Sequence, residues 1–467
     1  MSHTESPASA NESLAQAVDR VGSPVEFLRH QDWPSITFPI TPEFTNWRDE
    51  QRAWRTTVGL MDQSHHMTQL FLGGADLIPL LESLSPNTFA TFRPGVAKQL
   101  ITVNQDGYLI GDGILFYNAD EREGMVLVGH HIQIDWVRFN VEKAEAAGKD
   151  VHQRLDPNSN MRSGPPTYYR YELQGPEADR VMEKVFGGPV PDVNFFHIAD
   201  VKIAGKDVKA LRHGMAGQPG FEFYGPWEDH EAVHGALLEA GAEHGIREVG
   251  AKAYSSSPLE SGWVPTPLPA IFGEDFAEYR AWLPAARAGS IGGSLYSEDI
   301  EDYYVTPYDL GLGRSVRFNH DFHGRPALER HAENQTRRKV TLIWNAEDVA
   351  AIVRSQVEEG TPAKYLDFPK GRYGFYQMDE VVREGRRVGI STDAGYVAYP
   401  QLYMSLATVD VALQDGERVE IVWGEDPVSA KPQVDQHHRQ VRIRATVAPA
   451  PYQEYARTTY RANVSEA

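Results

Sequence analysis

The spacing of apolar positions is first helical and then strand-like. Residues 46–58 (NWRDEQRAWRTTV) place Trp47, Ala53 and Trp54 on one side of an amphipathic helix. A second helix is predicted at 77–84, despite an internal proline. Around it lie runs rich in β-branched and aromatic residues and bounded by glycines, which predict strands at 67–72, 99–103 and 110–116.

The same mixture of periods continues through the middle of the chain. Strands are predicted at 168–173 and 222–224, a hairpin at 200–211, and helices at 177–186 and 228–241. Because helices and strands are mixed without the regular alternation of parallel α/β folds, the pattern predicts an α+β class.

The pattern changes near residues 330–338, in the polar run RHAENQTRRK that begins at Arg330, which suggests a domain boundary. The following region indicates short strands separated by turns at Gly385, Gly389, Gly395 and Gly416. We expect a mobile tail at residues 1–24, a main region at 25–332 and a β-barrel-like domain at 333–467.

Composition narrows the classes of function. No apolar run approaches the ~20 residues that cross a bilayer, and the acidic, polar start lacks the features of a secretory signal, so we expect a cytoplasmic protein without membrane contact. The net charge is −20 and is spread along the chain, which makes nucleic acid an improbable partner. The absence of cysteine excludes disulfides, thiolate nucleophiles and cysteine-bound metals.

Common catalytic motifs give little support. Glycine clusters do not form a dinucleotide-binding GxGxxG motif, and GxSxG is missing. His230 and His234 form an HExxH pattern with Glu231, which in zinc peptidases supplies two ligands and a base. The polar residues before it and the lack of a distinctive third ligand favour a solvated helix over a metal site.

Polar residues recur instead in short glycine-flanked segments, where a ligand can approach the backbone closely. Taken singly, each has an ordinary structural interpretation: His65 or His66 as a satisfied structural histidine, Asp112 as a turn residue. The segments are 62–67 (DQSHHM), 111–113, 212–215, 220–222 and 254–263.

Together, and in order along nearly the whole chain, these segments resemble the folate-binding fold of the glycine-cleavage T protein. The motifs that carry the resemblance are DQSHHM, GYLIGDGILFY, ELQGP, GQPGFEFYGP, TPYDLGLG and DFHGRPAL. Further segments are similar to the tetrahydrofolate-dependent aryl O-demethylases that act on vanillate, 3-O-methylgallate and syringate: NWRDEQRAW, LRHGMAGQPG, AYSSSPLESGWVPTPLPAIF, IGGS, EDYYVTPYDLGLG and APAPYQEYAR.

The resemblance implies a three-domain cloverleaf around a central funnel that holds tetrahydrofolate, with two interleaved subdomains in residues 25–332. It implies an enzyme that moves a one-carbon unit from a small aromatic ether to the folate, leaving a phenol or a catechol, with no metal or redox cofactor. The bacterial sesamin-metabolising enzyme, which transfers a methylene carbon, resembles the same group. The physiological ether and the oligomeric state stay open.

Site residues follow from the matched positions. Tyr254, supported by His66, would protonate the departing oxygen, and Asp112 would orient or polarise the folate. Glu222 would bind the pterin edge. The resemblance also places Trp263, Gln63 and Val128 around the folate, with Gln63 shared with the aryl substrate.

Three positions depart from the patterns. Gly111 stands where the T protein has the first acid of its pair, although the aryl demethylases look the same here. His130 replaces the arginine that would grip a substrate carboxylate, and Phe38 replaces a tyrosine of the vanillate enzymes. The changes at positions 130 and 38 make the pocket less suited to an anionic substrate. A neutral aryl ether such as a lignan is therefore a candidate.

The alternatives are a benzoate O-demethylase of the vanillate or syringate type, a T-protein-like aminomethyltransferase and a non-catalytic folate-binding protein. Gly111 and the segment around Tyr254 speak against the aminomethyltransferase. Turnover with folate separates the enzymes from the binding protein, and a metallopeptidase would require zinc.

Overall fold

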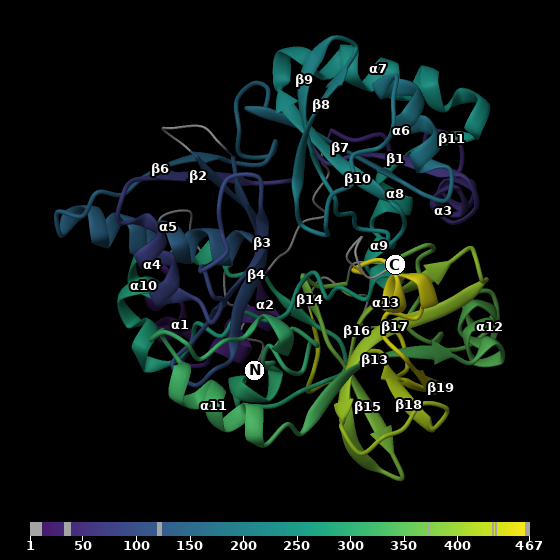
Figure 1. The fold of residues 1–467 in the computed structure, drawn as a ribbon. Helices are drawn as coiled ribbons and strands as arrows, with labels where there is room; N and C mark the ends of the chain where they lie inside the picture. The colour runs from purple at the N-terminus through teal and green to yellow at the C-terminus, as the bar shows by residue number, and fades with distance from the viewer. Residues whose placement is uncertain are drawn as a thin grey trace.

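The computed structural model describes residues 12–31, 39–118, 124–371, 373–431, 434 and 437–462. Phe38, predicted at the substrate, lies outside the described residues. Three large sheets, each in its own lobe, surround a common centre (Figure 1), and β12 and β14 form a further two-stranded parallel sheet. The mixture of helices and mainly antiparallel sheets confirms the predicted α+β class.

The first sheet has six strands in the order β11-β1-β7-β10-β9-β8. Only the β1–β11 pair in it is parallel. Apolar residues of α6 and α7 pack on this sheet in one buried cluster. The bounds are β1 Val58–Asp62, β7 Tyr168–Gln174, β8 Ile198–Ile203, β9 Lys206–Leu211, β10 Gly220–Pro226, β11 Ile246–Val249, α3 Trp47–Thr56, α6 Ala178–Phe186 and α7 His230–Gly241.

The second sheet is antiparallel, with the order β3-β4-β5-β2-β6. Its strands lie between β1 and β7 in the chain, so the two sheets are interleaved in sequence. Helices α4 and α5 bury their apolar faces against it. The bounds are β2 Gln69–Gly73, β3 Ala97–Val103, β4 Leu109–Tyr117, β5 Met125–Gly129, β6 His152–Asp156, α4 Leu77–Leu84 and α5 His131–Ala146.

The third lobe is a closed barrel with the order β13-β17-β16-β15-β18-β19. Its first strand starts four residues after α11 ends, so the predicted boundary at 332/333 falls in the last turn of α11; the domain division itself stays a prediction. The bounds are β13 Arg337–Trp344, β15 Asp379–Arg383, β16 Arg386–Val397, β17 Leu402–Asp410, β18 Arg418–Trp423, β19 Val441–Ala448, α11 Arg325–Glu333 and α12 Ala346–Ser355.

Two of the predicted barrel turns are wrong. Gly389 and Gly395 lie inside β16, which bends at a register irregularity between Thr392 and Gly395. A Cβ on Gly389 would lie 2.4 Å from the carbonyl oxygen of Thr408 on β17, so this glycine serves close strand approach instead of a turn. Gly385 and Gly416 do occupy turns.

The predicted tail is also corrected in part. Residues 14–21 form α1 (Leu14–Val21), which begins with a capping box between Ser13 and Gln16 and buries Leu14 and Ala17. The segment is therefore packed from residue 12 onward. The remaining elements are α2 Pro24–His30, α8 Ala251–Tyr254, α9 Ser257–Ser261, α10 Ala277–Trp282, α13 Glu454–Thr458, β12 Ile291–Gly292 and β14 Tyr376–Gln377.

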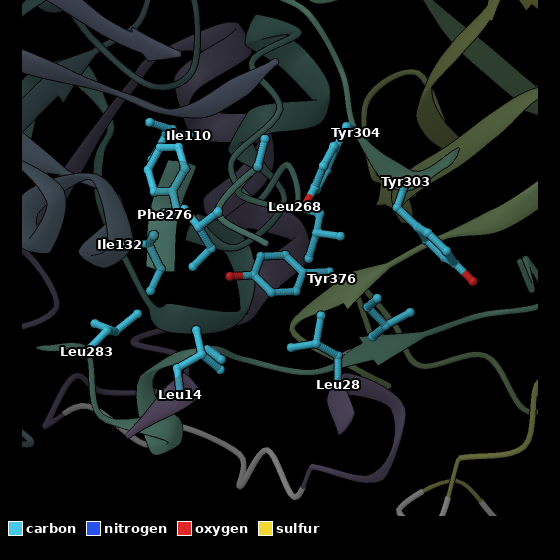
Figure 2. Close-up of a cluster of buried hydrophobic side chains, with 14 of the residues drawn as sticks. Leu14, Leu28, Ile110, Ile132, Leu268, Phe276, Leu283, Tyr303, Tyr304 and Tyr376 are labelled. Carbon is cyan, nitrogen blue, oxygen red and sulfur yellow. The ribbon is translucent and has the colours of Figure 1, made fainter. Parts of the chain in front are cut away.

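One large apolar cluster joins these peripheral elements to the lobes. Figure 2 shows Leu14 and Leu28 of the N-terminal helices beside Leu283 and Tyr376, with Ile110 and Ile132 of the second lobe nearby. Because segments far apart in the sequence share this apolar interior, its burial fixes how the lobes sit around the centre.

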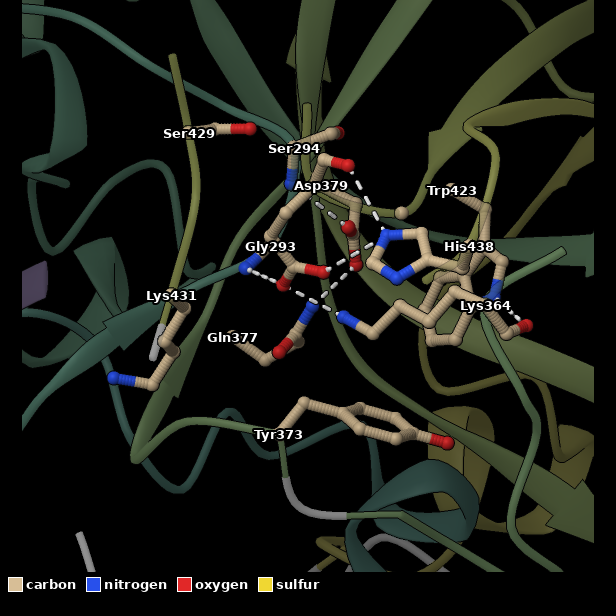
Figure 3. Close-up of polar contacts among 12 residues, drawn as sticks. Gly293, Ser294, Lys364, Tyr373, Gln377, Asp379, Trp423, Ser429, Lys431 and His438 are labelled. Carbon is tan, nitrogen blue, oxygen red and sulfur yellow. Dashed lines mark hydrogen bonds and ion pairs between the residues drawn. The ribbon is translucent and has the colours of Figure 1, made fainter. Parts of the chain in front are cut away.

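The barrel holds a buried polar network beneath the connection to the other lobes. Lys364 donates to Glu425 at 2.7 Å, and the backbone N–H of Gly293 donates to the same oxygen at 2.8 Å. His438 Nε2 lies 3.8 Å from the other oxygen of Glu425. Figure 3 shows Lys364, His438 and Asp379 close together in this network. The ion pair lies within the barrel region, and the N–H of Gly293 links its carboxylate to the segment that carries β12. A buried carboxylate needs such partners.

No helix among the residues placed in the structure is long and apolar enough to cross a membrane.

Candidate functional site

A cavity of about 900 Å³ lies at the centre, where the three lobes meet. Its wall combines apolar residues such as Phe195 and Phe375 with a few polar groups, which is typical of small-molecule sites. Eight of the nine site residues predicted from the sequence line it: Gln63, His66, Asp112, Val128, His130, Glu222, Tyr254 and Trp263.

Tyr254 and His66 form a hydrogen-bonded pair on the wall. Tyr254 ends the short helix α8, and His66 lies in the turn between β1 and β2. Tyr254 Oη lies 3.1 Å from His66 Nε2, and the two rings meet edge-on. Burial raises the pKa of Tyr254 well above its ordinary value, and the nearby Glu172 and Glu222 raise it further. The phenol therefore stays protonated and can donate a hydrogen bond.

Glu222 presents an ionised carboxylate to the cavity from β10. Arg170 donates to it at 2.6 Å from the neighbouring strand β7, and His213 Nδ1 lies 3.8 Å from its other oxygen. Burial by itself raises the pKa of Glu222, but the nearby imidazole of His213 and the charge of Arg170 together hold it below the ordinary value. The two oxygens of the Glu222 carboxylate are thus buried hydrogen-bond acceptors.

Glu172, which sequence reasoning missed, lies directly beside Glu222 in the register of β7 and β10. Its carboxyl accepts hydrogen bonds from the side chain of Gln63 and the backbone of Met215. Burial, with the repulsion of Glu222, raises the pKa of Glu172 to about 8. One member of the pair is therefore protonated and the other ionised at neutral pH, and Gln63 is fixed between Glu172 and the cavity.

Asp112 lies in β4, on the side of the cavity built by the second lobe. Its Oδ2 accepts hydrogen bonds from Gln99 at 2.7 Å and from the indole of Trp263 at 3.1 Å. Burial raises the pKa of Asp112, and these two hydrogen bonds oppose that change. The contact joins two residues that the resemblance assigns to the folate, Asp112 and Trp263, in one unit.

The structure gives a packing reason for Gly111. A Cβ at this position would lie 2.9 Å from Cβ of Gln133, which projects from α5. Gly113 and Gly129 are equally constrained, because they face each other across β4 and β5 with almost no space for a Cβ. A second acid at position 111 is therefore excluded by α5. Val128, next to Gly129, lines the cavity from β5.

His130 is the N-cap of α5, and its Nδ1 accepts the backbone N–H of Ile132 at 3.3 Å. Burial lowers the pKa of His130 to about 3, with a smaller contribution from the charge of Arg287, so the imidazole is neutral. Since Nδ1 is the acceptor, Nε2 carries the proton. Nε2 is buried and has no partner among the described residues.

Arg287 is a second group that sequence reasoning missed. It lines the cavity, and its carbonyl oxygen lies 2.8 Å from His131 Nε2, next to His130. Its Nε pairs with the buried Asp135, and its side chain stays 20% exposed. A guanidinium thus lies near the imidazole that replaces the expected arginine, although it comes from a segment 157 positions later.

The HExxH motif lies elsewhere, on α7. His230 stacks on Trp227 with ring centroids 3.9 Å apart, and His234 pairs with Glu248 at 3.2 Å. The two imidazoles therefore have separate local partners, as expected of a helix at the surface. Within the described ranges, no group of three or more metal-ligand side chains could hold an ion.

The cavity thus offers distinct groups on its walls: a protonated phenol with an imidazole, an ionised carboxylate fixed by arginine, and an aspartate held by an indole. Such an arrangement can orient a heterocycle through hydrogen bonds and donate a proton to a leaving group without a metal ion.

Known proteins similar to the chain agree on one family. Residues 11–266 match the family model described as the GCVT N-terminal domain. A syringate O-demethylase from a Sphingobium species is 44% identical over 457 residues, covering 96% of this chain and 97% of that protein. A sesamin methylene transferase from a Sinomonas species is 29% identical, with 81% and 82% covered.

The fold is also found among solved structures. The glycine cleavage system aminomethyltransferase T from Bartonella henselae aligns with a TM-score of 0.59 and 19% identity over 94% of this chain and 96% of that one. This likeness supports the predicted cloverleaf architecture.

Proposed function

The chain belongs to the family of the GCVT N-terminal domain, and on that basis we propose that it is a tetrahydrofolate-dependent transferase that cleaves an aromatic ether. The ether carbon passes to the folate, and a phenol or catechol is released. The observation that carries the proposal is the Tyr254–His66 pair in a cavity that also contains the ionised Glu222. The names of the two relatives, an O-demethylase and a methylene transferase, support the same chemistry.

The residues present fit a folate. The pterin ring carries neighbouring N–H donors, and the ionised Glu222 offers two acceptor oxygens that Arg170 holds in place. The buried Nδ1 of His213 and Nη2 of Arg170 have no hydrogen-bond partner among the described residues, so polar capacity remains at this end. The volume of about 900 Å³ suits a folate ring system with a small aromatic substrate.

The reaction exchanges a carbon for a proton. Folate supplies the nucleophilic nitrogen that accepts the carbon. The C–O bond breaks with its electron pair on the aryl oxygen, the nitrogen loses its proton, and the oxygen gains one. For a methyl ether the products are a phenol and 5-methyl-tetrahydrofolate.

Tyr254 is the proton donor in this account. We assign His66 the tautomer with Nε2 protonated, so that it donates to Tyr254 Oη and leaves the phenol proton directed at the aryl oxygen. General acid catalysis of this kind contributes a factor of about 10² to 10⁴. Asp112 holds Trp263 through a hydrogen bond and orients the folate side.

Two substrate classes fit the far end of the cavity. A neutral ether, such as a methylenedioxyphenyl lignan, suits the uncharged His130, whose Nε2–H can donate to one oxygen. A benzoate suits Arg287, whose guanidinium can pair with a carboxylate although the arginine expected at position 130 is missing. The name of the syringate enzyme favours the benzoate.

The test is an anaerobic incubation with tetrahydrofolate and a panel of vanillate, syringate, guaiacol and a methylenedioxyphenyl lignan, with both products measured by mass spectrometry. Equal amounts of phenol and methyl-folate from the benzoates identify an acid demethylase, and methylene-folate from the lignan alone identifies the neutral class. If no folate-dependent product forms from any member, the proposal is wrong.

A further inference from the structure

A second, smaller cavity of about 300 Å³ adjoins the central one. The two share Gln99, Phe195, Phe196 and Arg461 in their walls, so the smaller cavity is a continuation of the site. It lies against the face of the second lobe where β3 carries Lys98 and Gln99 side by side.

Four cations line this cavity, although the protein as a whole has a net charge of −20. None of them forms an ion pair with a carboxylate in the part of the chain that the structure describes. In a chain with 65 acids against 45 lysines and arginines, four unneutralised cations around one small space are exceptional. The four are Lys98, Arg314, Arg317 and Arg461.

The charges repel one another. Burial lowers the pKa of Lys98, and the charge of Arg317 lowers it further. Arg461 likewise lies within reach of Arg314 at one end and of Asp112 at the other. Lys98 is held over the rings of Phe89 and Phe92 at 5.6 and 5.8 Å, which positions its ammonium group without a counter-ion. This unfavourable arrangement is relieved when an anion binds.

Together, these cations form a path from the central cavity to the surface. Arg461 lines both cavities, whereas Arg314 and Arg317 are exposed at the outer side. An extended anion with several charges fits this path, and because the two cavities are continuous it can be part of the same molecule as the occupant of the central cavity.

We propose that the cavity lined by Lys98, Arg314, Arg317 and Arg461 binds the carboxylates of a γ-linked glutamate chain on the folate. The inference rests on the proposed function. A folate with one glutamate has two carboxylates, and each further γ-linked glutamate adds one. Four cations match the four carboxylates of a triglutamate, so the site selects folates with extended chains.

The experiment compares the affinity of the whole protein for tetrahydrofolate with one and with three glutamates, at low and high salt. We expect the triglutamate to bind at least about tenfold more tightly, because each charge-assisted contact is worth roughly that factor. The preference should shrink as salt rises. Since this comparison uses the unaltered protein, it does not depend on whether a variant folds.

The double variant Arg314→Ser/Arg317→Ser then tests the location. Both side chains are exposed, so the fold should tolerate the change. We expect the ratio of the two affinities to fall toward one. The charge-matched control is Arg386→Ser/Arg418→Ser, at exposed barrel positions away from both cavities, and it should keep the ratio of the unaltered protein.

The outcomes are distinguishable. Equal affinity for the two folates, or a preference that survives in the double variant, overturns the inference while leaving the proposed function intact. If neither folate binds, the proposed function fails as well. If inorganic phosphate binds and this binding is lost in the double variant, with no effect on the folates, the cavity is a general anion site and the inference is wrong.

Discussion

The phenol of Tyr254 and the imidazole of His66 lie within hydrogen-bonding distance, 3.1 Å, although 188 positions separate them in the chain. The sheet order explains the contact, because β1 pairs in parallel with β11, and the two residues follow these neighbouring strands. Side chains from the same edge of the sheet thus meet on the cavity wall. The pair is therefore a product of the fold and is fixed before substrate binds.

Replacing Tyr254 by phenylalanine should remove the proposed proton donor and leave the cavity shape almost unchanged. We expect kcat to fall by a factor of about 10² or more, with little change in folate affinity. Tyr169→Phe is the matched control, because this phenol is fully buried, lies outside the cavity and has no hydrogen-bond partner among the described residues. Equal kcat values for Tyr254→Phe and the unaltered enzyme would remove Tyr254 from the mechanism.

The raised pKa of Glu172 predicts a pH-dependent stability. The carboxyl titrates near 4.5 in the unfolded chain and near 8 in the folded protein. Between these values the folded protein keeps a proton that the unfolded chain has released, so this residue makes the protein less stable as pH rises. Glutamine cannot ionise, so Glu172→Gln does not have this loss. The melting temperature of the variant minus that of the unaltered protein should therefore increase from pH 5 to pH 8.

Glu222 should have the opposite effect on the pH dependence of stability, which Glu222→Gln would remove. Its pKa is lowered in the folded protein, so its ionisation contributes stability above the ordinary pKa that is lost as pH falls. At pH 7 this variant should lose about 3 to 5 kcal/mol, because Arg170 keeps a buried charge without its partner. For Glu172, a difference in melting temperature between Glu172→Gln and the unaltered protein that stays constant from pH 5 to pH 8 would contradict the assignment of a neutral carboxyl.

Arg287 should determine how the enzyme treats acids. Arg287→Gln should raise KM for vanillate or syringate at least about tenfold, since a charge-assisted pair is lost, and should affect guaiacol much less. Arg287→Lys keeps the charge but not the bidentate geometry, and should restore part of the affinity. Steady-state kinetics on both substrates measure the effect. Equal losses on the acid and on guaiacol would show that Arg287 does not bind a carboxylate.

Packing against Gln133 should require a glycine at position 111. Gly111→Ala places a Cβ 2.9 Å from Cβ of Gln133, and we expect a loss of about 1 to 3 kcal/mol in the free energy of unfolding. Gly235→Ala is the same chemical change in the exposed middle of α7, where a Cβ meets no atom within 4 Å, and it should stabilise the protein by about 0.5 to 1 kcal/mol. Denaturant titration compares them. If Gly111→Ala is as stable as the parent, packing does not explain the missing acid.

Local patterns predicted much of the first two lobes. The helix expected at 77–84 has those bounds, and α3 starts after Asn46, whose side chain caps it as expected of that residue type. These elements carry their own signals of period and capping. Helix α12 was not predicted. The turn predicted at Gly389 is wrong because a glycine required by close strand approach looks the same in a sequence as a glycine in a turn.

The residues of the site likewise divide into those that the sequence predicted and those that it did not. The resemblance supplied the residues that line the cavity and the pairing of Tyr254 with His66, whereas the residues that hold Glu222, Gln63 and His130 in place were not predicted. Arg170 and Glu172 lie in β7, where they read as part of an ordinary strand, and their importance depends on pairing with β10. Arg287 approaches His130 only through the packing of a distant loop. Such contacts depend on strand register and lobe packing, which a single sequence does not express.

The most direct test of the account follows the ether carbon itself. Syringate labelled with ¹³C in its methoxy groups is incubated anaerobically with tetrahydrofolate and the enzyme, and the folate and phenol products are quantified together. The proposed reaction predicts one labelled carbon on folate for each methoxy group lost, and a loss of this transfer in Tyr254→Phe. Demethylation without label on folate, or no demethylation of syringate, guaiacol or the lignan, would contradict it.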